Sequence, residues 1–165
     1  MRFAIGDLIV YGETGVCRVA DIVEKEFLDG KKNCYQLQPI YQSCMIFTPA
    51  DNEAVFMRPI MTREEADDLL ERICSIEPTE ITASNPRELS EKYDAVIKSH
   101  DCEVLVSFAK SIYAKRERLI ATKKKLSAVD ERYMKRAEDL LFGEIAVSLG
   151  IDRIAVKETV AEKLK

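Results

Sequence analysis

The 165-residue sequence predicts an α+β protein of two domains. We expect a five-stranded SH3-like or Tudor-like β-barrel over residues 1–60 and an all-helical bundle over residues 61–165. Two observations support this prediction. Up to about residue 60, short β-rich runs alternate with turn residues too closely for helices to form. From Thr62 onward, apolar residues recur at the three-to-four-residue spacing that is typical of amphipathic helices.

Five short runs predict the strands of the N-terminal domain. They are residues 8–11, 16–23, 34–37, 44–48 and 54–57. Asp29-Gly30, between the second and third runs, supplies the positive φ that a tight hairpin needs. A meander of this kind can hide its apolar side by curling into a small barrel, which leaves few exposed strand edges.

Capping signals predict where the helices begin. Thr62-Arg63-Glu64-Glu65 has the pattern of a capping box, and Asn85-Pro86 has the pattern of an N-cap followed by proline at the first helical position. Further helices are expected from Cys102 to Lys124, from Ser127 to a stop at Gly150, and over residues 152–163. The predicted core side of the third helix carries Leu105, Phe108, Ile112, Leu119 and Ile120.

The sequence offers no catalytic constellation. His100 is the one histidine, and its neighbours Asp101 and Cys102 have no third partner for a nucleophile or a metal cage. Residues 12–15 resemble part of a glycine-rich phosphate loop, but no Gly-Lys-Ser/Thr and no helix start follow them. We therefore expect a turn at residues 12–15, a solvated histidine at a helix end, and no enzyme.

The cysteines indicate neither disulfides nor zinc. Their number, five, is odd and none forms a CxxC pair. Cys17, Cys34 and Cys44 fall in three predicted strands and could meet, but a fourth ligand is missing. We interpret them as small buried hydrophobic residues and expect no metal and no cofactor.

No apolar run is long enough to span a membrane and no signal-peptide core follows the N-terminus, so a cytoplasmic location is expected.

One basic block stands out in an acidic chain. The net charge is -4, yet residues 106–136 carry 10 Lys or Arg against 3 Asp or Glu. The candidate nucleic-acid-binding residues in this block are Lys110, Tyr113, Lys115, Arg116, Arg118, Lys123, Lys124 and Lys125. On a helix, Lys110 and Tyr113 share a stripe predicted to face solvent. The block is either a docking surface for a polyanion or a solvated helix face that balances the acidic residues 61–105.

Five motifs follow one another along residues 3–150. They are Gly6-Asp7-Leu8-Ile9-Val10-Tyr11 with Gly15-Val16, Thr48-Pro49-Ala50-Asp51-Asn52, Phe56-Met57-Arg58-Pro59-Ile60, Leu126-Ser127-Ala128, and Ala137-Glu138-Asp139-Leu140-Leu141-Phe142-Gly143-Glu144-Ile145-Ala146. In their order and spacing they resemble the CarD/CdnL family of bacterial transcription regulators. The N-terminal module of that family is shared with the RNA-polymerase-interaction domain of the transcription-repair coupling factor.

The resemblance implies two partners and no catalysis. In the family, the barrel adds a strand to the β subunit of RNA polymerase, and the helical domain contacts promoter DNA at the upstream edge of the melted bubble. The implied polymerase contact comprises Met45, Ile46, Phe47 and Thr48. Many members carry an arginine where this chain has Phe47. The family's tryptophan wedge is replaced here by Tyr113, and this chain contains no tryptophan.

The leading hypothesis is therefore a CarD-like regulator. It would bridge RNA polymerase through residues 1–60 and largely sequence-independent promoter DNA through the basic helix, and so modulate the stability of the open complex. The alternative hypothesis is an adaptor that keeps the polymerase contact without productive DNA binding. We expect a monomer that does not interact with membranes.

Overall fold

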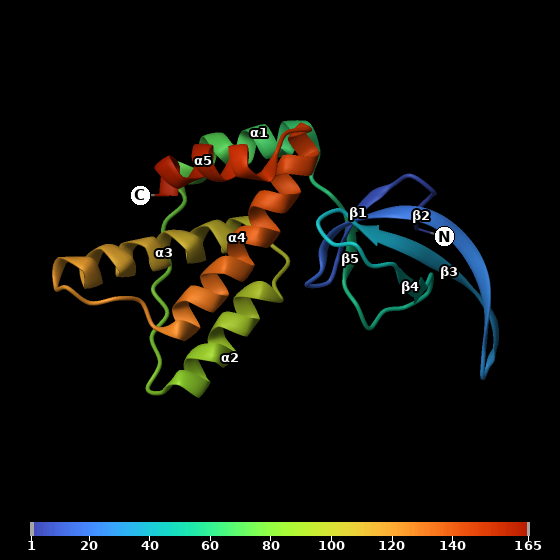
Figure 1. The fold of residues 1–165 in the computed structure, drawn as a ribbon, viewed down its shortest axis with the longest axis horizontal. Helices are drawn as coiled ribbons and strands as arrows, with labels where there is room; N and C mark the ends of the chain where they lie inside the picture. The colour runs from blue at the N-terminus through green and yellow to red at the C-terminus, as the bar shows by residue number, and fades with distance from the viewer. Residues whose placement is uncertain (1, 165) are drawn as a thin grey trace. The chain divides into compact units, whose positions relative to one another are not determined.

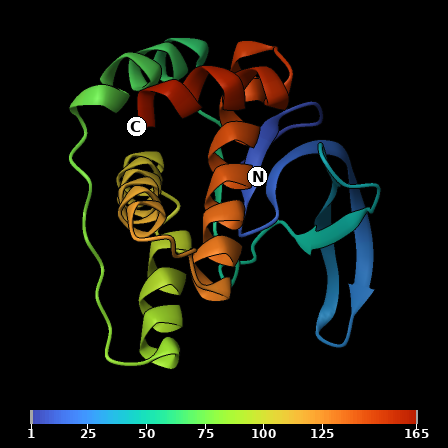
Figure 2. The ribbon, with the colours of Figure 1, turned by 60° about the vertical axis from the view of Figure 1, so that its left-hand side comes forward.

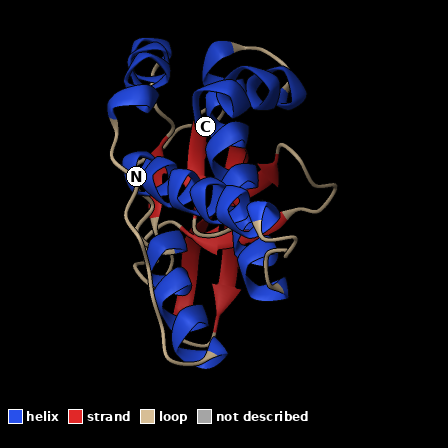
Figure 3. Ribbon diagram, turned by 90° about the vertical axis from the view of Figure 1, so that its left-hand side faces the viewer, coloured by secondary structure: helices blue, strands red, loops and turns tan. Residues whose placement is uncertain are grey.

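The computed structural model describes residues 2–164 and divides into two compact units, Met1–Ile60 and Met61–Lys165. All strands lie in the first unit and all helices in the second, so the chain is α+β as predicted. Strands are drawn red and helices blue in Figure 3. None of the described helices is both long enough and apolar enough to cross a membrane.

The N-terminal unit is a five-stranded antiparallel sheet (Figure 1). Its strands, in the spatial order β4-β3-β2-β1-β5, are β1 (Leu8–Tyr11), β2 (Gly15–Phe27), β3 (Gly30–Pro39), β4 (Ile46–Pro49) and β5 (Met57–Pro59). A register shift between Val19 and Asp21 marks an irregularity in β2. Figure 1 shows β2 as a curved strand. One side of the sheet packs into a core of Phe3, Ile9, Cys17, Val19, Tyr35, Leu37 and Met57.

The expected barrel is not confirmed, because the sheet is open. No pairing among the described strands joins β4 to β5. Both are short and each ends in a proline, Pro49 or Pro59, which has no N–H to donate to a ladder.

The predicted fifth strand was placed too early, at residues 54–57, because a turn precedes the real one. The Asn52 N–H donates to the Pro49 carbonyl at 3.0 Å, and the Asn52 side chain accepts from the Ala54 N–H at 2.9 Å. These bonds hold the backbone in a turn, so β5 begins only at Met57.

The C-terminal unit is a helical bundle arranged around one long helix (Figure 2). Its elements are α1 (Arg63–Arg72), the short 3-10 helix η1 (Ile73–Ser75), α2 (Pro86–Ile97), α3 (Cys102–Ala121), α4 (Ala128–Leu149) and α5 (Arg153–Leu164). α4 contacts α1, α2, α3 and α5. Its inward residues, among them Leu141, Phe142 and Ile145, form the middle of the core for that reason.

The predicted helix starts are confirmed by their side-chain caps. The Thr62 hydroxyl accepts from the Glu65 N–H at 3.1 Å, and the Glu65 carboxylate accepts in return from the Thr62 N–H at 3.3 Å. The Asn85 side chain accepts from the Glu88 N–H at the start of α2, and the Ser127 hydroxyl accepts from the Asp130 N–H at the start of α4. Gly150 ends α4 with a φ of 68°, a left-handed conformation that favours glycine.

The prediction that the third helix continues to Lys124 was wrong, because α3 ends at Ala121. The Lys124 N–H donates to the Leu119 carbonyl at 2.7 Å, and the Lys123 N–H donates to the Ile120 carbonyl at 2.9 Å. This is the Schellman pattern, with Lys123 at a φ of 59° in place of the usual glycine. Ile120, predicted to face the core, is 57% exposed because it lies in this last turn.

The backbone at the start of the C-terminal unit is held by buried side chains of α4. The Met61 N–H donates to Glu144 Oε2 at 2.8 Å, and the Ser148 hydroxyl donates to the Met61 carbonyl at 2.8 Å. The Cys102 thiol donates to the other Glu144 oxygen at 3.4 Å. Glu144 is only 3% exposed, so its contacts are structural ones within the bundle.

Candidate functional site

The first candidate surface is the outer edge of β4, where residues 45–48 were expected to contact a partner. β4 pairs with β3 alone, with Tyr35 opposite Thr48, Gln36 opposite Phe47 and Leu37 opposite Ile46. The Ala50 N–H donates to the Asn33 carbonyl at 2.9 Å, which continues the same register. Since hydrogen-bonded pairs alternate along an antiparallel ladder, Thr48 and Ile46 direct their backbone groups toward β3.

The Phe47 backbone therefore faces away from the sheet. The alternation turns its N–H and carbonyl toward the open edge, together with the Pro49 carbonyl. Because Pro49 has no N–H, it can occupy such an outward position without losing a ladder bond. An unpaired N–H and two carbonyls at an edge are what an added strand requires.

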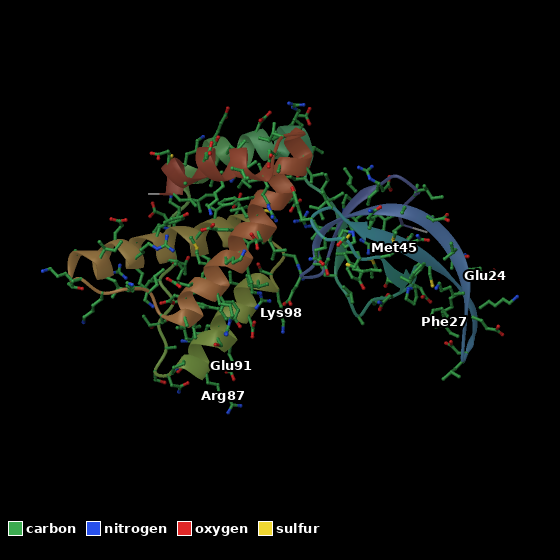
Figure 4. The ribbon with its side chains drawn as sticks, in the orientation of Figure 1. Glu24, Phe27, Met45, Arg87, Glu91 and Lys98 are labelled. Carbon is green, nitrogen blue, oxygen red and sulfur yellow. The ribbon has the colours of Figure 1, made fainter. Side chains whose placement is uncertain are left out.

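The side chains of this segment divide between core and surface. Thr48 is buried, and its hydroxyl accepts from the Asn52 amide at 3.1 Å, while Ile46 is half-buried against the core. Met45 and Phe47 are exposed, at 43% and 45%. Figure 4 shows Met45 near β4 and Phe27 toward the far end of the β2–β3 hairpin. The exposed pair is an apolar contact surface beside the free backbone groups.

Lys25 belongs to this surface, although no motif or spacing in the sequence marks it. Its ammonium lies 3.7 Å from the centre of the Phe47 ring, at cation–π distance. A positive charge thus lies over the residue that replaces an arginine in many members of the resembled family. Lys25 is on β2 and Phe47 on β4, so only the docking of β4 onto β3 brings them together.

The second candidate surface is the basic segment on α3 and in the turn that follows it. The structure places its members in different environments. Lys110 does not line a free solvent stripe: its ammonium donates to the carbonyls of Ile73, Cys74 and Ile76 at 2.7, 3.2 and 2.6 Å. Lys110 therefore caps η1, a role that helical periodicity alone could not reveal.

Lys115 is part of a buried polar cluster. Its ammonium lies 2.9 Å from Asp130 Oδ2, and the Tyr93 hydroxyl donates to Asp130 Oδ1 at 2.6 Å. Asp130 is 1% exposed. Burial raises the pKa of Asp130, but hydrogen bonds from Tyr93 and Lys115 lower it, and the net pKa is below the usual value. The charge of Lys115 is consequently engaged inside the bundle.

Tyr113 and Arg118 also have acidic partners. The Tyr113 hydroxyl donates to Glu138 at 3.2 Å, and burial together with the nearby Glu138 carboxylate raises the pKa of Tyr113 to about 12. Its ring is half-buried and packs against the core of the bundle. Arg118 lies 3.6 Å from Glu80, with both side chains exposed.

The cations with the greatest freedom are in the turn after α3. Lys123, Lys124 and Lys125 are all exposed, and no ion pair is formed by them with any of residues 2–164. Arg116 stacks over the Tyr113 ring at 5.5 Å. A polyanion approaching the bundle would meet these four charges without first displacing a carboxylate.

The sulfur and histidine candidates form no site within residues 2–164, where no group of three His, Cys, Asp or Glu side chains could hold a metal ion. Cys17 and Cys34 are buried, as interpreted from the sequence, whereas Cys44 is exposed. Burial and the neighbouring Cys44 raise the pKa of the Cys17 thiol to about 12. His100 is half-buried just beyond α2.

Comparison with known proteins identifies the N-terminal unit. Residues 3–61 match the family model described as the CarD-like/TRCF RID domain. No curated protein is a significant match to the chain. The matched residues contain the whole sheet, with the β4 edge and Lys25.

Proposed function

We propose, from the membership of residues 3–61 in the CarD-like/TRCF RID family of RNA-polymerase-interaction domains, that the chain binds RNA polymerase through β4. The polymerase β subunit adds a strand along Phe47, and Met45, Phe47 and Lys25 supply the side-chain contacts. The observation that supports this most directly is the outward-facing Phe47 backbone on an open edge within the matched domain. The role is non-enzymatic.

Two variants distinguish the contribution of the Phe47 backbone N–H from that of the Phe47 ring. Phe47→Pro eliminates the outward N–H and the ring, while Phe47→Ala eliminates the ring alone. We expect Phe47→Pro to weaken polymerase binding by about tenfold more than Phe47→Ala, because a backbone bond at the centre of the added strand is lost. Surface plasmon resonance with immobilised RNA polymerase measures both affinities. Equal affinities for the two folded variants would exclude strand addition at Phe47.

Proline at Ile46 would be a poorer test. The ladder directs the Ile46 N–H toward Leu37, so Ile46→Pro breaks a bond between β3 and β4. A loss of binding would then report damage to the sheet. Phe47 is suitable because its N–H has no role in the β3–β4 ladder.

For the C-terminal unit, we propose sequence-independent contact with promoter DNA, through which the protein modulates the stability of the open complex. Lys123, Lys124 and Lys125 reach DNA phosphates, with Arg116 on the helix beside them. The exposure of the three lysines and their lack of ion pairs within the described chain support this assignment.

A second candidate function is an adaptor that binds polymerase without productive DNA binding. It is favoured by the contacts of Lys110, Lys115 and Arg118 with carbonyl or carboxylate groups of the bundle, because those charges are already bound.

Lys123→Gly tests the phosphate contact proposed for Lys123 without damaging the fold. Glycine tolerates the left-handed conformation, so we expect the free energy of unfolding to rise by about 1 kcal/mol. If the turn binds phosphates, the slope of log K against log salt for duplex binding becomes shallower by about 1. Urea denaturation and fluorescence anisotropy at several salt concentrations measure the two effects. An unchanged slope in the stabilised variant would remove Lys123 from the DNA surface.

A further inference from the structure

The hairpin formed by β2 and β3 extends past the part of the sheet that β4 covers (Figure 1). β4 pairs with Cys34–Leu37 of β3, whereas the β2–β3 ladder continues for four further pairs, from Glu24–Asn33 to Phe27–Gly30. We call residues 24–33 the hairpin extension. None of its side chains belongs to the core of the N-terminal unit. A two-stranded ribbon without a packed face is only marginally stable, so core packing does not explain the extension.

The tip of the extension carries two apolar side chains. Leu28 is fully exposed and Phe27 is 38% exposed. Leu28 takes the first position of the two-residue loop between Phe27 and Gly30, where asparagine or glycine would suit the backbone better. Neither the turn nor the core therefore requires an apolar residue at this position. Burial of both side chains by a partner would be favourable, because it removes their apolar surface from water.

The extension shares one face of the sheet with the candidate surface at β4. Directly opposed residues of neighbouring strands direct their side chains to the same face, and every second residue of a strand shares that face. Phe47 on β4 opposes Gln36 on β3. Gly30, six residues before Gln36 and hence on the same face, opposes Phe27. The contact of the Lys25 ammonium with the Phe47 ring, at 3.7 Å, links the two parts of this face.

The β4 edge alone is too small for a stable interface. β4 has four residues and is therefore roughly 13 Å long, at about 3.3 Å per residue. An ordinary protein interface covers about 800 Å² of each partner, which is a patch roughly 30 Å across. The six residues between the levels of Phe47 and Phe27 correspond to about 20 Å along the face. A partner strand on β4 that belongs to an interface of ordinary size would thus reach the tip.

We propose that the Phe27–Leu28 tip inserts into an apolar pocket of RNA polymerase, beside the strand that β4 accepts. The inference rests on the proposed polymerase contact and adds a second point of attachment to it. Charge favours a protein partner over a lipid surface. Three lysines of the extension are balanced by three acidic residues, so the tip has no net charge that would attract it to anionic lipids.

The experiment replaces Leu28 and a matched exposed isoleucine in the full chain. Leu28→Asn removes the apolar side chain and suits the turn, so the hairpin remains folded. Ile5→Asn is the control, because Ile5 is 60% exposed in the turn before β1. The next residue, Gly6, donates its N–H to the Val19 carbonyl at 2.7 Å, eight residues along β2 from Phe27. Circular dichroism checks the folding of both variants. Surface plasmon resonance measures their binding to immobilised RNA polymerase and to vesicles of phosphatidylcholine and phosphatidylserine.

We expect Leu28→Asn to weaken polymerase binding by about tenfold, mainly through faster dissociation, and Ile5→Asn to change it by less than about twofold. Phe27→Thr, which keeps a good strand former, should weaken binding to a similar extent. Unchanged polymerase affinity in folded Leu28→Asn overturns the proposal, as do equal losses in Leu28→Asn and Ile5→Asn. Vesicle binding that Leu28→Asn abolishes, with polymerase binding intact, would identify a lipid contact instead and also overturn it.

The same assay separates this inference from the proposed function. If Phe47→Pro weakens polymerase binding more than Phe47→Ala while Leu28→Asn has no effect, strand addition stands and the tip contact is excluded. If Leu28→Asn weakens binding while the two Phe47 variants have equal affinities, the tip contact stands and strand addition at Phe47 is excluded. Absence of polymerase binding by the unmodified chain overturns both.

Discussion

Replacing Glu144 by alanine is expected to lower the free energy of unfolding of the full chain by about 3 kcal/mol. The change leaves the Met61 N–H without its 2.8 Å partner in a place where Met61 is 8% exposed. It also removes the acceptor of the Cys102 thiol and leaves a void in the core. Urea denaturation followed by circular dichroism measures the loss.

Two further variants make this result specific. Glu144→Gln keeps an oxygen that can accept from Met61, so it should cost less than the alanine change. Asp139→Ala removes an exposed carboxylate of the same helix, which lies 3.5 Å from the Lys135 ammonium, and should change stability by less than about 0.5 kcal/mol. If Glu144→Ala costs no more than Asp139→Ala, the Met61 contact does not stabilise the bundle.

The helix starts were predictable because their signals are local. Thr62, Asn85 and Ser127 each accept from an N–H three residues ahead, so the cap and its partner are read from one short stretch of sequence. The end of α3 was missed for a related reason. No glycine marks it, and a lysine in the left-handed conformation has no sequence signature.

The long-range parts of the fold could not be predicted in this way. Met61 and Glu144 are 83 residues apart, and in the sequence Glu144 stands out only as a member of a family motif. The five strands were expected from their alternation and turns, but closure into a barrel depends on pairing between the short strands β4 and β5. That pairing is not a local property of either strand.

The same distinction applies to the candidate surfaces. Charge and periodicity located the basic segment, but they could not tell Lys110, bound to three carbonyls of the η1 region, from Lys124, exposed in a turn. The difference depends on which segments pack against α3. At the β4 edge, the resemblance indicated residues 45–48, whereas the direction of the Phe47 backbone follows only from the register with β3.

Replacing Lys115 by alanine is the second change with a large expected effect, a loss of about 3 kcal/mol of unfolding free energy. Asp130 would remain almost fully buried, with its charge balanced only by the Tyr93 hydroxyl and the cap region of α4. Arg118→Ala is the matched control, because its pair with Glu80 is exposed on both sides and contributes at most about 1 kcal/mol. Urea denaturation at pH 7 compares the two variants.

The acid dependence of stability provides an independent test of the same contact. The pKa of Asp130 is lower in the folded chain than in the unfolded chain, where aspartate titrates near about 3.9. Its contribution to stability is therefore complete above that value and is lost as the pH falls through the lower, folded-state pKa. Removing Lys115 raises the folded-state pKa of Asp130 toward the unfolded-state value, so the acid loss of unfolding free energy that comes from Asp130 should be smaller in Lys115→Ala than in Arg118→Ala. Equal losses of unfolding free energy in the two variants over this pH range would show that Lys115 does not hold the Asp130 charge. If the expected difference is found, any loss of DNA binding by Lys115→Ala must be corrected for its unfolded fraction, and Lys123→Gly remains the cleaner probe of the DNA surface.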